Sequence, residues 1–196
     1  VTGGCAIDTD QIVLCNAAAA NDFEQARYLE LVSVWGQIDR IELHHPPAMP
    51  LLCDGFLAPL PGGWGVGSTY EQRPWTVADA SAANLQKFNH WWRNMTGSAP
   101  ASLAGPPLRG NRAVASARRP LVGAVHHVEL QKVPRLLLHT GHGSQGTVSA
   151  PFAAECIASE LSGEFAPASR AELASIGSLR FRERQMRRGP RHGARA

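Results

Sequence analysis

Three glycines in the last third of the chain are the clearest candidate for a ligand-binding site. Gly141, Gly143 and Gly146 match the pattern GxGxxG, between a predicted strand at 135–140 and a predicted helix at 148–161. Glycines let the backbone approach a ligand closely. The start of a helix offers free amide donors and a partial positive charge to an anion or an electron-rich carbonyl. A tight turn whose glycines serve only packing is the alternative, and the pattern alone leaves both open.

The chain after this loop does not suit a complete dinucleotide-binding domain. Such a domain continues with a second parallel strand that ends in an acidic residue about 20 residues further on. Residues 162–173 (SGEFAPASRAEL) contain no apolar strand, and too little chain follows for the remaining elements. A complete Rossmann domain that starts at Gly141 is therefore not expected.

Metal, thiol and hydrolase chemistry have no motif in this sequence. The histidine pairs at 44–45 and 126–127 are not at the spacing of an HExxH site, and the four cysteines include no CxxC pair. We therefore expect no metal site, and we find no Ser/His/Asp order typical of hydrolases. His142 differs from the other histidines because it lies inside the glycine loop, where it is a candidate to contact a cofactor.

Positive charge is concentrated at the C-terminal end. From residue 179 onward there are seven arginines and one acidic residue, a net charge of +6, whereas the rest of the chain carries −3. Such a segment favours a polyanionic partner, because each arginine that neutralises a phosphate releases a condensed counterion. A solvated or frayed terminus is the alternative. The candidate RNA-binding residues are Arg180, Arg182, Arg184, Arg187 and Arg188.

Length and composition indicate one or two globular domains. The chain has 196 residues, of which 44% are hydrophobic and 18% charged. No apolar run reaches the roughly 18 to 20 residues of a membrane span, and the first residues lack the order of a signal peptide, so a soluble cytoplasmic protein is expected. The chain begins with Val1 and enters a strand-like run at 12–15, so we expect it to be a piece of a longer protein.

The elements that must position these residues can be read from turns, caps and periodicity. Short apolar runs between 30 and 70, with a Pro-Gly-Gly turn, predict an antiparallel sheet. Thr76, three residues before Asp79, predicts the start of a helix that lies on this sheet. The Gly-, Pro- and Ser-rich segment 96–110 predicts a surface loop or a crossing between subdomains, and it is the expected internal boundary. Ser169 is predicted to cap a last short helix.

Several ordered motifs resemble the FAD-dependent oxidoreductases of the D-amino acid oxidase and glycine oxidase type. The loop and helix GHGSQGTVSAPFAAECIASELSG are similar to the C-terminal flavin loop and closing helix of that family. VSVWGQID resembles its xxRGQxx strand, CDGFLAPLPGGWGVGSTYE its xDGYLTPxxxGxxxxGATYE hairpin, and NRAVASARRPLVG its xRxxTxDxxPxVG segment. The ending ELASIGSLRFRERQMRRG resembles the LxxLxPxRxxxRxLxRG tail of the bifunctional tRNA 5-methylaminomethyl-2-thiouridine biosynthesis family.

This resemblance covers about residues 7–190 and implies an α+β fold. The expected architecture is a partial D-amino acid oxidase-like flavoprotein fold, in which a mostly antiparallel substrate-domain sheet joins the closing strand and helix of an FAD-binding Rossmann-like domain. The FAD-binding strand that holds the ADP part and a methyltransferase domain are expected upstream. The expected segments are a remnant strand of the FAD-binding domain at 1–17, the substrate-domain sheet and helix at 18–111, the C-terminal FAD-domain segment at 112–178 and a basic tail at 179–196.

The activity that the resemblance implies is oxidation of a modified wobble uridine in tRNA. An FAD enzyme of this kind would remove the carboxymethyl group of 5-carboxymethylaminomethyl-(2-thio)uridine to give the 5-aminomethyl form. Its implied partners are tRNA and the upstream FAD-binding and methyltransferase segments of the full-length protein. A glycine oxidase-like FAD oxidase of small amino acids and a non-catalytic RNA-binding remnant are the alternatives.

The resemblance also assigns site residues. The loop residues Gly141, Gly143, Ser144, Gln145 and Gly146 would lie along the pyrimidine edge of the flavin, with His142 among them. Arg112 matches the arginine that binds the substrate carboxylate, although an ion pair is the alternative. Phe56 stands where relatives carry tyrosine, and is either an aromatic wall over the flavin or a core residue. Trp35, Ala115 and Ala117 replace the arginine, threonine and aspartate of the family pattern, which favours the non-catalytic alternative.

Overall fold

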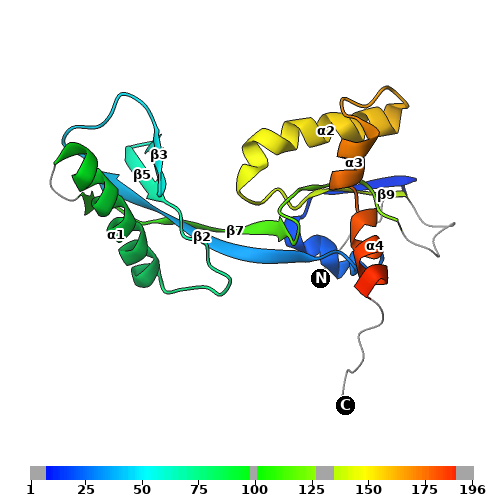
Figure 1. The fold of residues 1–196 in the computed structure, drawn as a ribbon, viewed down its shortest axis with the longest axis horizontal. Coiled ribbons are helices and arrows are strands. Elements are labelled where there is room, and N and C mark those ends of the chain that lie inside the picture. Colours follow the sequence, from blue (N-terminus) through cyan, green and yellow to red (C-terminus); the bar gives the residue numbers. More distant parts are fainter. Residues whose placement is uncertain (1–7, 98–100, 127–134, 189–196) are drawn as a thin grey trace, which may run out of the picture. The chain divides into compact units, whose positions relative to one another are not determined.

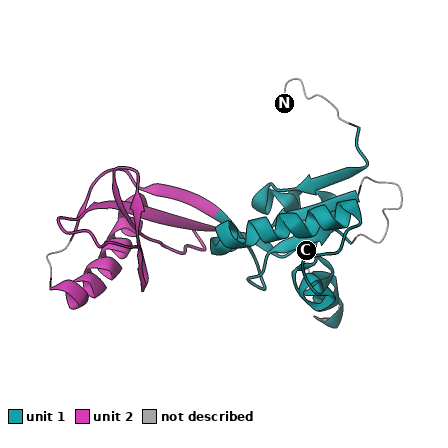
Figure 2. Ribbon diagram, turned by 90° about the horizontal axis from the view of Figure 1, so that it is seen from above, with its two compact units in different colours: residues 1–32, 112–196 teal, residues 33–111 magenta. Residues whose placement is uncertain are grey.

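The computed structural model describes residues 8–97, 101–126 and 135–188, which fold into two compact units. Unit 1 is formed by Val1–Val32 with Arg112–Ala196, and unit 2 by Ser33–Asn111 (Figure 2). Helices and sheets occur in both units, so the predicted α+β class is confirmed.

The units do not follow the predicted segments at every boundary. The predicted substrate-domain segment, 18–111, ends where unit 2 ends. Residues 18–32, however, cluster with unit 1, because Leu29 and Leu31 pack into the core of that unit. The chain passes between the units within two strands, β2 (Leu31–Glu42) and β7 (Leu108–Ala115).

Unit 1 is a three-stranded sheet covered by helices on both faces. Its strand order is β1-β9-β8, with β1 parallel and β8 antiparallel to β9. Successive side chains of a strand point to opposite faces, so the fully buried neighbours Leu137 and Leu138 lie in different cores. Leu137 packs with Ile157 and Leu138 with Phe181. The elements of unit 1 are β1 (Gln11–Leu14), η1 (Ala17–Asp22), η2 (Glu24–Ala26), β8 (Leu121–Ala124), β9 (Arg135–Thr140), η3 (Gly143–Gln145), α2 (Gly146–Ser162), α3 (Arg170–Ile176) and α4 (Leu179–Arg188) (Figure 1).

Helix α3 of unit 1 begins at its predicted cap, and α4 is docked by a buried aromatic side chain. Ser169 accepts a hydrogen bond from the Glu172 amide, and the Glu172 carboxylate accepts one from the Ser169 amide, which completes the predicted capping box of α3. Phe181, with no exposed surface, fixes α4 to the sheet. Over its described residues, therefore, the basic segment is a docked helix and not a frayed terminus.

Unit 2 is an antiparallel sheet with one long helix, as the sequence predicts. The strand order is β3-β4-β5-β2-β6, and β7 also pairs with β2. Helix α1 starts at the predicted cap, where Thr76 Oγ1 accepts a hydrogen bond from Asp79 N over 3.1 Å. Its Phe88 and Trp92 pack on Ile41 of the sheet. The elements are β2 (Leu31–Glu42), β3 (Leu51–Cys53), β4 (Gly55–Leu60), β5 (Gly63–Gly67), α1 (Val77–Thr96), β6 (Ser102–Leu103) and β7 (Leu108–Ala115).

The segment predicted as a surface loop, 96–110, is only partly a loop. Of its described residues, two form strand β6, which pairs with the end of β2 in the register Ile41 to Leu103, and β7 begins at Leu108. A short strand adds to the free edge of a sheet through backbone hydrogen bonds alone, so a Gly- and Pro-rich composition does not reveal it. Within the described residues, no helix combines the length and the apolar composition needed to cross a bilayer.

Candidate functional site

The glycine loop joins β9 to α2 in unit 1. Gly141 and Gly143 have φ angles of 71° and 58°, in the left-handed region that favours glycine. A Cβ atom on Gly141 would lie 3.2 Å from Leu31 Cδ2, so the Leu31 side chain would have to shift to accept a larger residue there. At Gly143 the nearest neighbour of such an atom, Val114 Cγ2, would be 3.6 Å away, an ordinary contact. Close packing and the positive φ angle therefore both favour glycine at position 141. At position 143 the positive φ angle of the turn favours glycine, and packing does not.

The start of α2 is open to a ligand. Gln145 precedes the helix without giving it a side-chain hydrogen bond, and the first turn contains no acidic residue. Ser144, Gln145, Thr147 and Val148 are exposed. The first amides of a helix have no partner within the helix and carry the positive end of its dipole. The loop thus presents donors and positive potential to an anion or carbonyl oxygen.

His142 adds a hydrogen-bond acceptor to this loop. Its Nδ1 lies 2.9 Å from Ser149 Oγ, and that hydroxyl donates its proton to the Gln145 carbonyl over 2.9 Å. The hydroxyl must therefore accept from Nδ1–H. Burial, and secondarily the nearby His139, hold the pKa of His142 below its ordinary value, so the ring is neutral at pH 7. Nε2 consequently carries a lone pair.

This Nε2 atom is buried and has no hydrogen-bond partner among the described residues. The pyrimidine edge of a flavin offers carbonyl oxygens beside a ring N–H. The loop offers amide donors beside an imidazole acceptor. The residues from Gly141 to Gly146 therefore fit a flavin by their donors and acceptors.

The two predicted substrate-site residues lie in different units. Arg112 is a half-buried residue of β7 in unit 1, and Phe56 is a half-buried residue of β4 in unit 2. Phe56 pairs through its backbone with Gly67 and lines a small cavity with Trp91. These surroundings are compatible with both interpretations of Phe56, a core aromatic residue and a residue that contacts a ligand. Ala115, where the family pattern has threonine, is fully buried among apolar side chains.

Most of the predicted RNA-binding arginines contact their own unit. The Arg180 guanidinium donates to the carbonyl oxygens of Ser175, Arg119 and Pro120 over 2.5, 2.9 and 3.1 Å. The Arg182 guanidinium lies 4.5 Å from the centroid of the Tyr28 ring.

Arg184 is also held inside unit 1, where its Nη1 lies 2.9 Å from Glu30 Oε2. Arg187, by contrast, has an 81% exposed side chain and a loose ion pair of 3.6 Å with Glu183. The Arg188 side chain is outside the described part of the structure. Of these arginines, therefore, Arg187 is the one that the structure shows in contact with solvent rather than with the fold.

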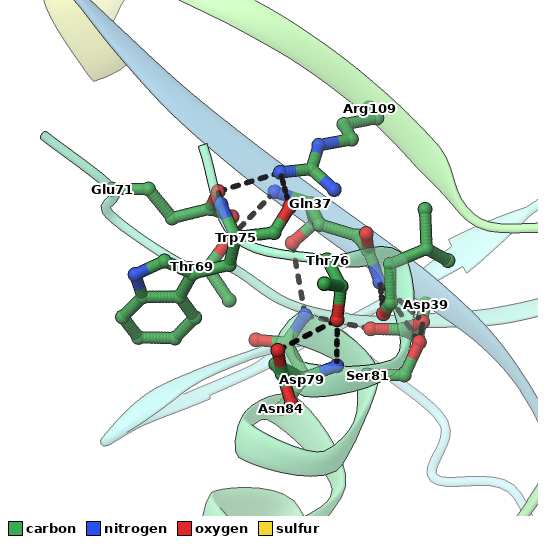
Figure 3. A network of polar contacts seen from close by, with 11 residues as sticks. Gln37, Asp39, Thr69, Glu71, Trp75, Thr76, Asp79, Ser81, Asn84 and Arg109 are labelled. Atoms are coloured by element: carbon green, nitrogen blue, oxygen red, sulfur yellow. Dashed lines mark hydrogen bonds and ion pairs between the residues drawn. The ribbon is translucent and has the colours of Figure 1, made fainter. Parts of the chain in front are cut away.

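Unit 2 contains a buried polar network that the sequence did not reveal (Figure 3). One of its members is the glutamine of a motif identified above. Asp39, 1% exposed, accepts hydrogen bonds from Gln37 Nε2 at 3.0 Å, Ser81 Oγ at 2.5 Å and Asn84 Nδ2 at 2.7 Å. Gln37 belongs to the GQ motif of β2, and Ser81 and Asn84 to the first turns of α1. The glutamine of the motif therefore attaches α1 to the sheet.

The second half of this network surrounds Glu71. Its carboxylate accepts from Thr69 Oγ1 at 2.5 Å, Trp75 N at 2.8 Å and Arg109 Nη2 at 2.7 Å. The Arg109 guanidinium also lies 5.5 Å from the ring centroid of Trp35. Trp35 is the residue that replaces the motif arginine, and the guanidinium in this network belongs to Arg109 of β7. An apolar tryptophan and a distant arginine give no pattern that a sequence motif could detect.

No group of three or more His, Cys, Asp or Glu side chains within the described residues could hold a metal ion.

The sequence is similar to those of the bifunctional tRNA 5-methylaminomethyl-2-thiouridine biosynthesis proteins. No protein-family model matches it. It is 34% identical over 200 residues to the tRNA 5-methylaminomethyl-2-thiouridine biosynthesis bifunctional protein MnmC of Methylobacillus flagellatus, covering 89% of this chain and 30% of that protein. The MnmC protein of Burkholderia mallei is 30% identical over 210 residues, covering 96% and 32%. The chain thus spans about 30% of the length of the curated relatives it matches.

Solved structures with a similar fold include an iminodiacetate oxidase and a glycine oxidase. Iminodiacetate oxidase from a Chelativorans species superposes with a TM-score of 0.66 and 21% identity, covering 89% of this chain and 47% of that chain. Glycine oxidase from Bacillus cereus gives a TM-score of 0.63 and 15% identity, covering 85% and 45%. Over nearly its whole length, therefore, the chain resembles one segment of the bifunctional tRNA 5-methylaminomethyl-2-thiouridine biosynthesis proteins, and it has the partial fold of a D-amino acid oxidase-like oxidoreductase.

Proposed function

We propose that the chain is part of an FAD-dependent oxidoreductase that modifies the wobble uridine of tRNA. The observation that carries this proposal is the loop from Gly141 to Gly146, in which the uncapped start of α2 lies beside the unpartnered Nε2 of His142. The similarity to MnmC proteins supports the choice of tRNA over a free amino acid.

The loop residues would hold the flavin ring. Amide groups at the start of α2 would bind its carbonyl oxygens and favour negative charge on it. His142 Nε2 would accept a hydrogen bond from its ring N–H. When bound, FAD supplies the redox chemistry, taking up the hydride released from the substrate. Arg112 would bind the substrate carboxylate through the paired N–H groups of its guanidinium, and Phe56 would provide an apolar surface.

The proposed reaction is removal of the carboxymethyl group from 5-carboxymethylaminomethyl-(2-thio)uridine. Glycine and iminodiacetate, which give two structural neighbours their names, both contain an amine nitrogen bonded to CH2–COO⁻. The modified uridine carries this same group. Oxidation at the methylene carbon and hydrolysis by water would release glyoxylate and leave the 5-aminomethyl group.

The remaining length of the relatives suggests the partners. We propose that further FAD-binding and methyltransferase segments complete the protein, because the chain spans about 30% of its relatives. The methyltransferase would act on the aminomethyl group that the oxidation exposes.

The proposal is tested with two polypeptides, the 196-residue chain and the same chain extended by the sequence that precedes it in its gene. We expect flavin absorption bands to co-purify with the longer polypeptide. Mass spectrometry of tRNA nucleosides should then show conversion of the carboxymethylaminomethyl to the aminomethyl uridine. Turnover of glycine derivatives without any change in tRNA would favour a small-molecule oxidase. Absence of flavin from both polypeptides would leave only the non-catalytic RNA-binding alternative.

A further inference from the structure

The turn between β7 and β8 carries two adjacent arginines outside the basic segment. Arg118 and Arg119 are both exposed, and within the described residues neither side chain forms an ion pair. Arg118 has a left-handed backbone, with φ of 54°, and its amide donates to the Ala115 carbonyl over 2.8 Å. The turn is therefore a defined structure, and its two guanidinium groups are available to a partner.

Helix α4 holds this turn at both ends. Arg180 donates to the backbone carbonyls of Arg119 and Pro120 over 2.9 and 3.1 Å. Arg184 Nη1 donates to Ser116 Oγ over 2.7 Å and also pairs with Glu30. The contacts at Arg119 and Pro120 use backbone atoms. The Arg118 and Arg119 side chains thus remain free to bind elsewhere while the turn that carries them is fixed.

The same contacts bring like charges together. Burial, followed by the positive charges of Arg119 and Arg184, lowers the pKa of Arg180 to about 10. Arg187 lies on the same side of α4, at the helical spacing from Arg180 and Arg184 that places residues on one face. Two acids, Glu30 and Glu183, pair with these arginines. A surface with this excess of positive charge attracts a polyanion.

We propose that Arg118, Arg119 and Arg187 bind phosphate groups of tRNA, and that Arg180 and Arg184 position the turn for this contact. The inference rests on the proposed tRNA substrate, and it assigns different roles to arginines that the sequence presents as equivalent. A guanidinium binds a phosphate through two parallel N–H groups, which suits exposed arginines on a fixed turn.

The first test compares two charge-matched double variants. R118Q/R119Q removes two charges from the turn but keeps the backbone carbonyls that Arg180 binds. R73Q/R93Q removes two exposed charges from unit 2 and is the control. Binding of fluorescently labelled tRNA is measured by anisotropy between 50 and 200 mM salt. We expect R118Q/R119Q to weaken binding about tenfold and to reduce the slope of log K against log salt by about 2. The control should keep the wild-type slope.

The positioning role of Arg180 is tested by Arg180→Lys, which keeps the charge but cannot bind both carbonyls of the turn in the same way. We expect R180K to weaken tRNA binding in the wild-type background and to have little further effect in the R118Q/R119Q background. Equal effects in both backgrounds would contradict positioning, because a general loss of structure does not depend on these two side chains. Far-UV circular dichroism establishes that each variant is folded.

The outcomes separate this inference from the proposed function. Equal loss of tRNA binding in R118Q/R119Q and R73Q/R93Q overturns the phosphate site but leaves tRNA as the substrate. If the wild-type protein does not bind tRNA, both the phosphate site and the proposed tRNA substrate are overturned. Vesicles containing phosphatidylserine serve as a second polyanion, and binding to these vesicles in place of tRNA would identify the surface as a membrane contact and overturn the inference.

Discussion

Arg109 donates a hydrogen bond to Glu71 over 2.7 Å within unit 2, where the Glu71 side chain has no exposed surface and that of Arg109 is 18% exposed. The partners come from β7 and from the segment before α1. Thr69 and Trp75 donate to the same carboxylate. The buried charge is thus neutralised by one guanidinium and stabilised by two further donors.

Loss of this guanidinium should destabilise unit 2. Arg109→Met leaves a buried carboxylate without its cation, and we expect a loss of about 3 kcal/mol in the free energy of unfolding. Urea unfolding followed by tryptophan fluorescence measures it, since all five tryptophans lie in unit 2. Arg40→Met is the matched control, because the one side-chain hydrogen bond that Arg40 donates within the described residues is an exposed contact with the Pro61 carbonyl. Equal losses in the two variants would show that the ion pair contributes little.

The Glu71 carboxylate also predicts a pH dependence. Burial by itself would raise its pKa, but the hydrogen bonds from Thr69 and Trp75 and the charge of Arg109 outweigh burial and hold the pKa below the ordinary value of 4.5. A carboxylate with a lowered pKa in the folded state stabilises the protein above pH 4.5, and this stabilisation is lost as the pH falls through the folded value.

The measurement compares urea unfolding of wild type and Glu71→Gln from pH 6 to pH 3. Wild type should lose stability more steeply than the variant, so the two curves converge at low pH. Parallel curves would mean that another acid controls the acid sensitivity of this unit.

Two glycines with similar backbone angles should respond differently to alanine. Gly141 and Gly163 have φ of 71° and 75°, but a Cβ on Gly163 meets nothing within 4 Å, whereas one on Gly141 meets Leu31 at 3.2 Å. Gly163→Ala should cost about 1 kcal/mol from backbone strain. Gly141→Ala should cost about 1 kcal/mol more, because the core must also adjust. Far-UV circular dichroism reports both units, so the unfolding of unit 1, which has no tryptophan, is the part of the far-UV transition that tryptophan fluorescence does not follow. Equal costs would exclude a packing role for Gly141.

His142 should titrate below the ordinary histidine value of 6.5. A neutral buried histidine stabilises the folded state above pH 6.5, and the stabilisation is lost as the pH falls through its lowered pKa. NMR of the ring C–H resonances measures this pKa directly. His139→Asn should raise it toward 6.5, because the charge of His139 is the second cause of the shift. Nitrogen shifts should show the proton on Nδ1, and a proton on Nε2 would contradict the acceptor role of His142.

Local signals in the sequence determined several elements of the fold. The caps at Thr76 and Ser169 are formed with residues only three positions away, so the segment that contains the signal also contains its partner. The strand at 135–140 and the glycine loop after it follow from apolar periodicity and from the backbone freedom of glycine. The α+β class follows from the resemblance of the ordered motifs to the D-amino acid oxidase-like family, and the structure confirms it.

Tertiary structure alone decided what the charged residues do. In the sequence, Arg180, Arg184 and Arg187 belong to one basic run. In the fold, Arg180 binds carbonyls 60 and 61 residues away, Arg184 pairs with a glutamate 154 residues away, and Arg187 remains exposed. Glu71 and Arg109 are likewise 38 residues apart. A charged side chain is internal or exposed according to which distant segment packs beside it, and residue type and spacing do not contain that information.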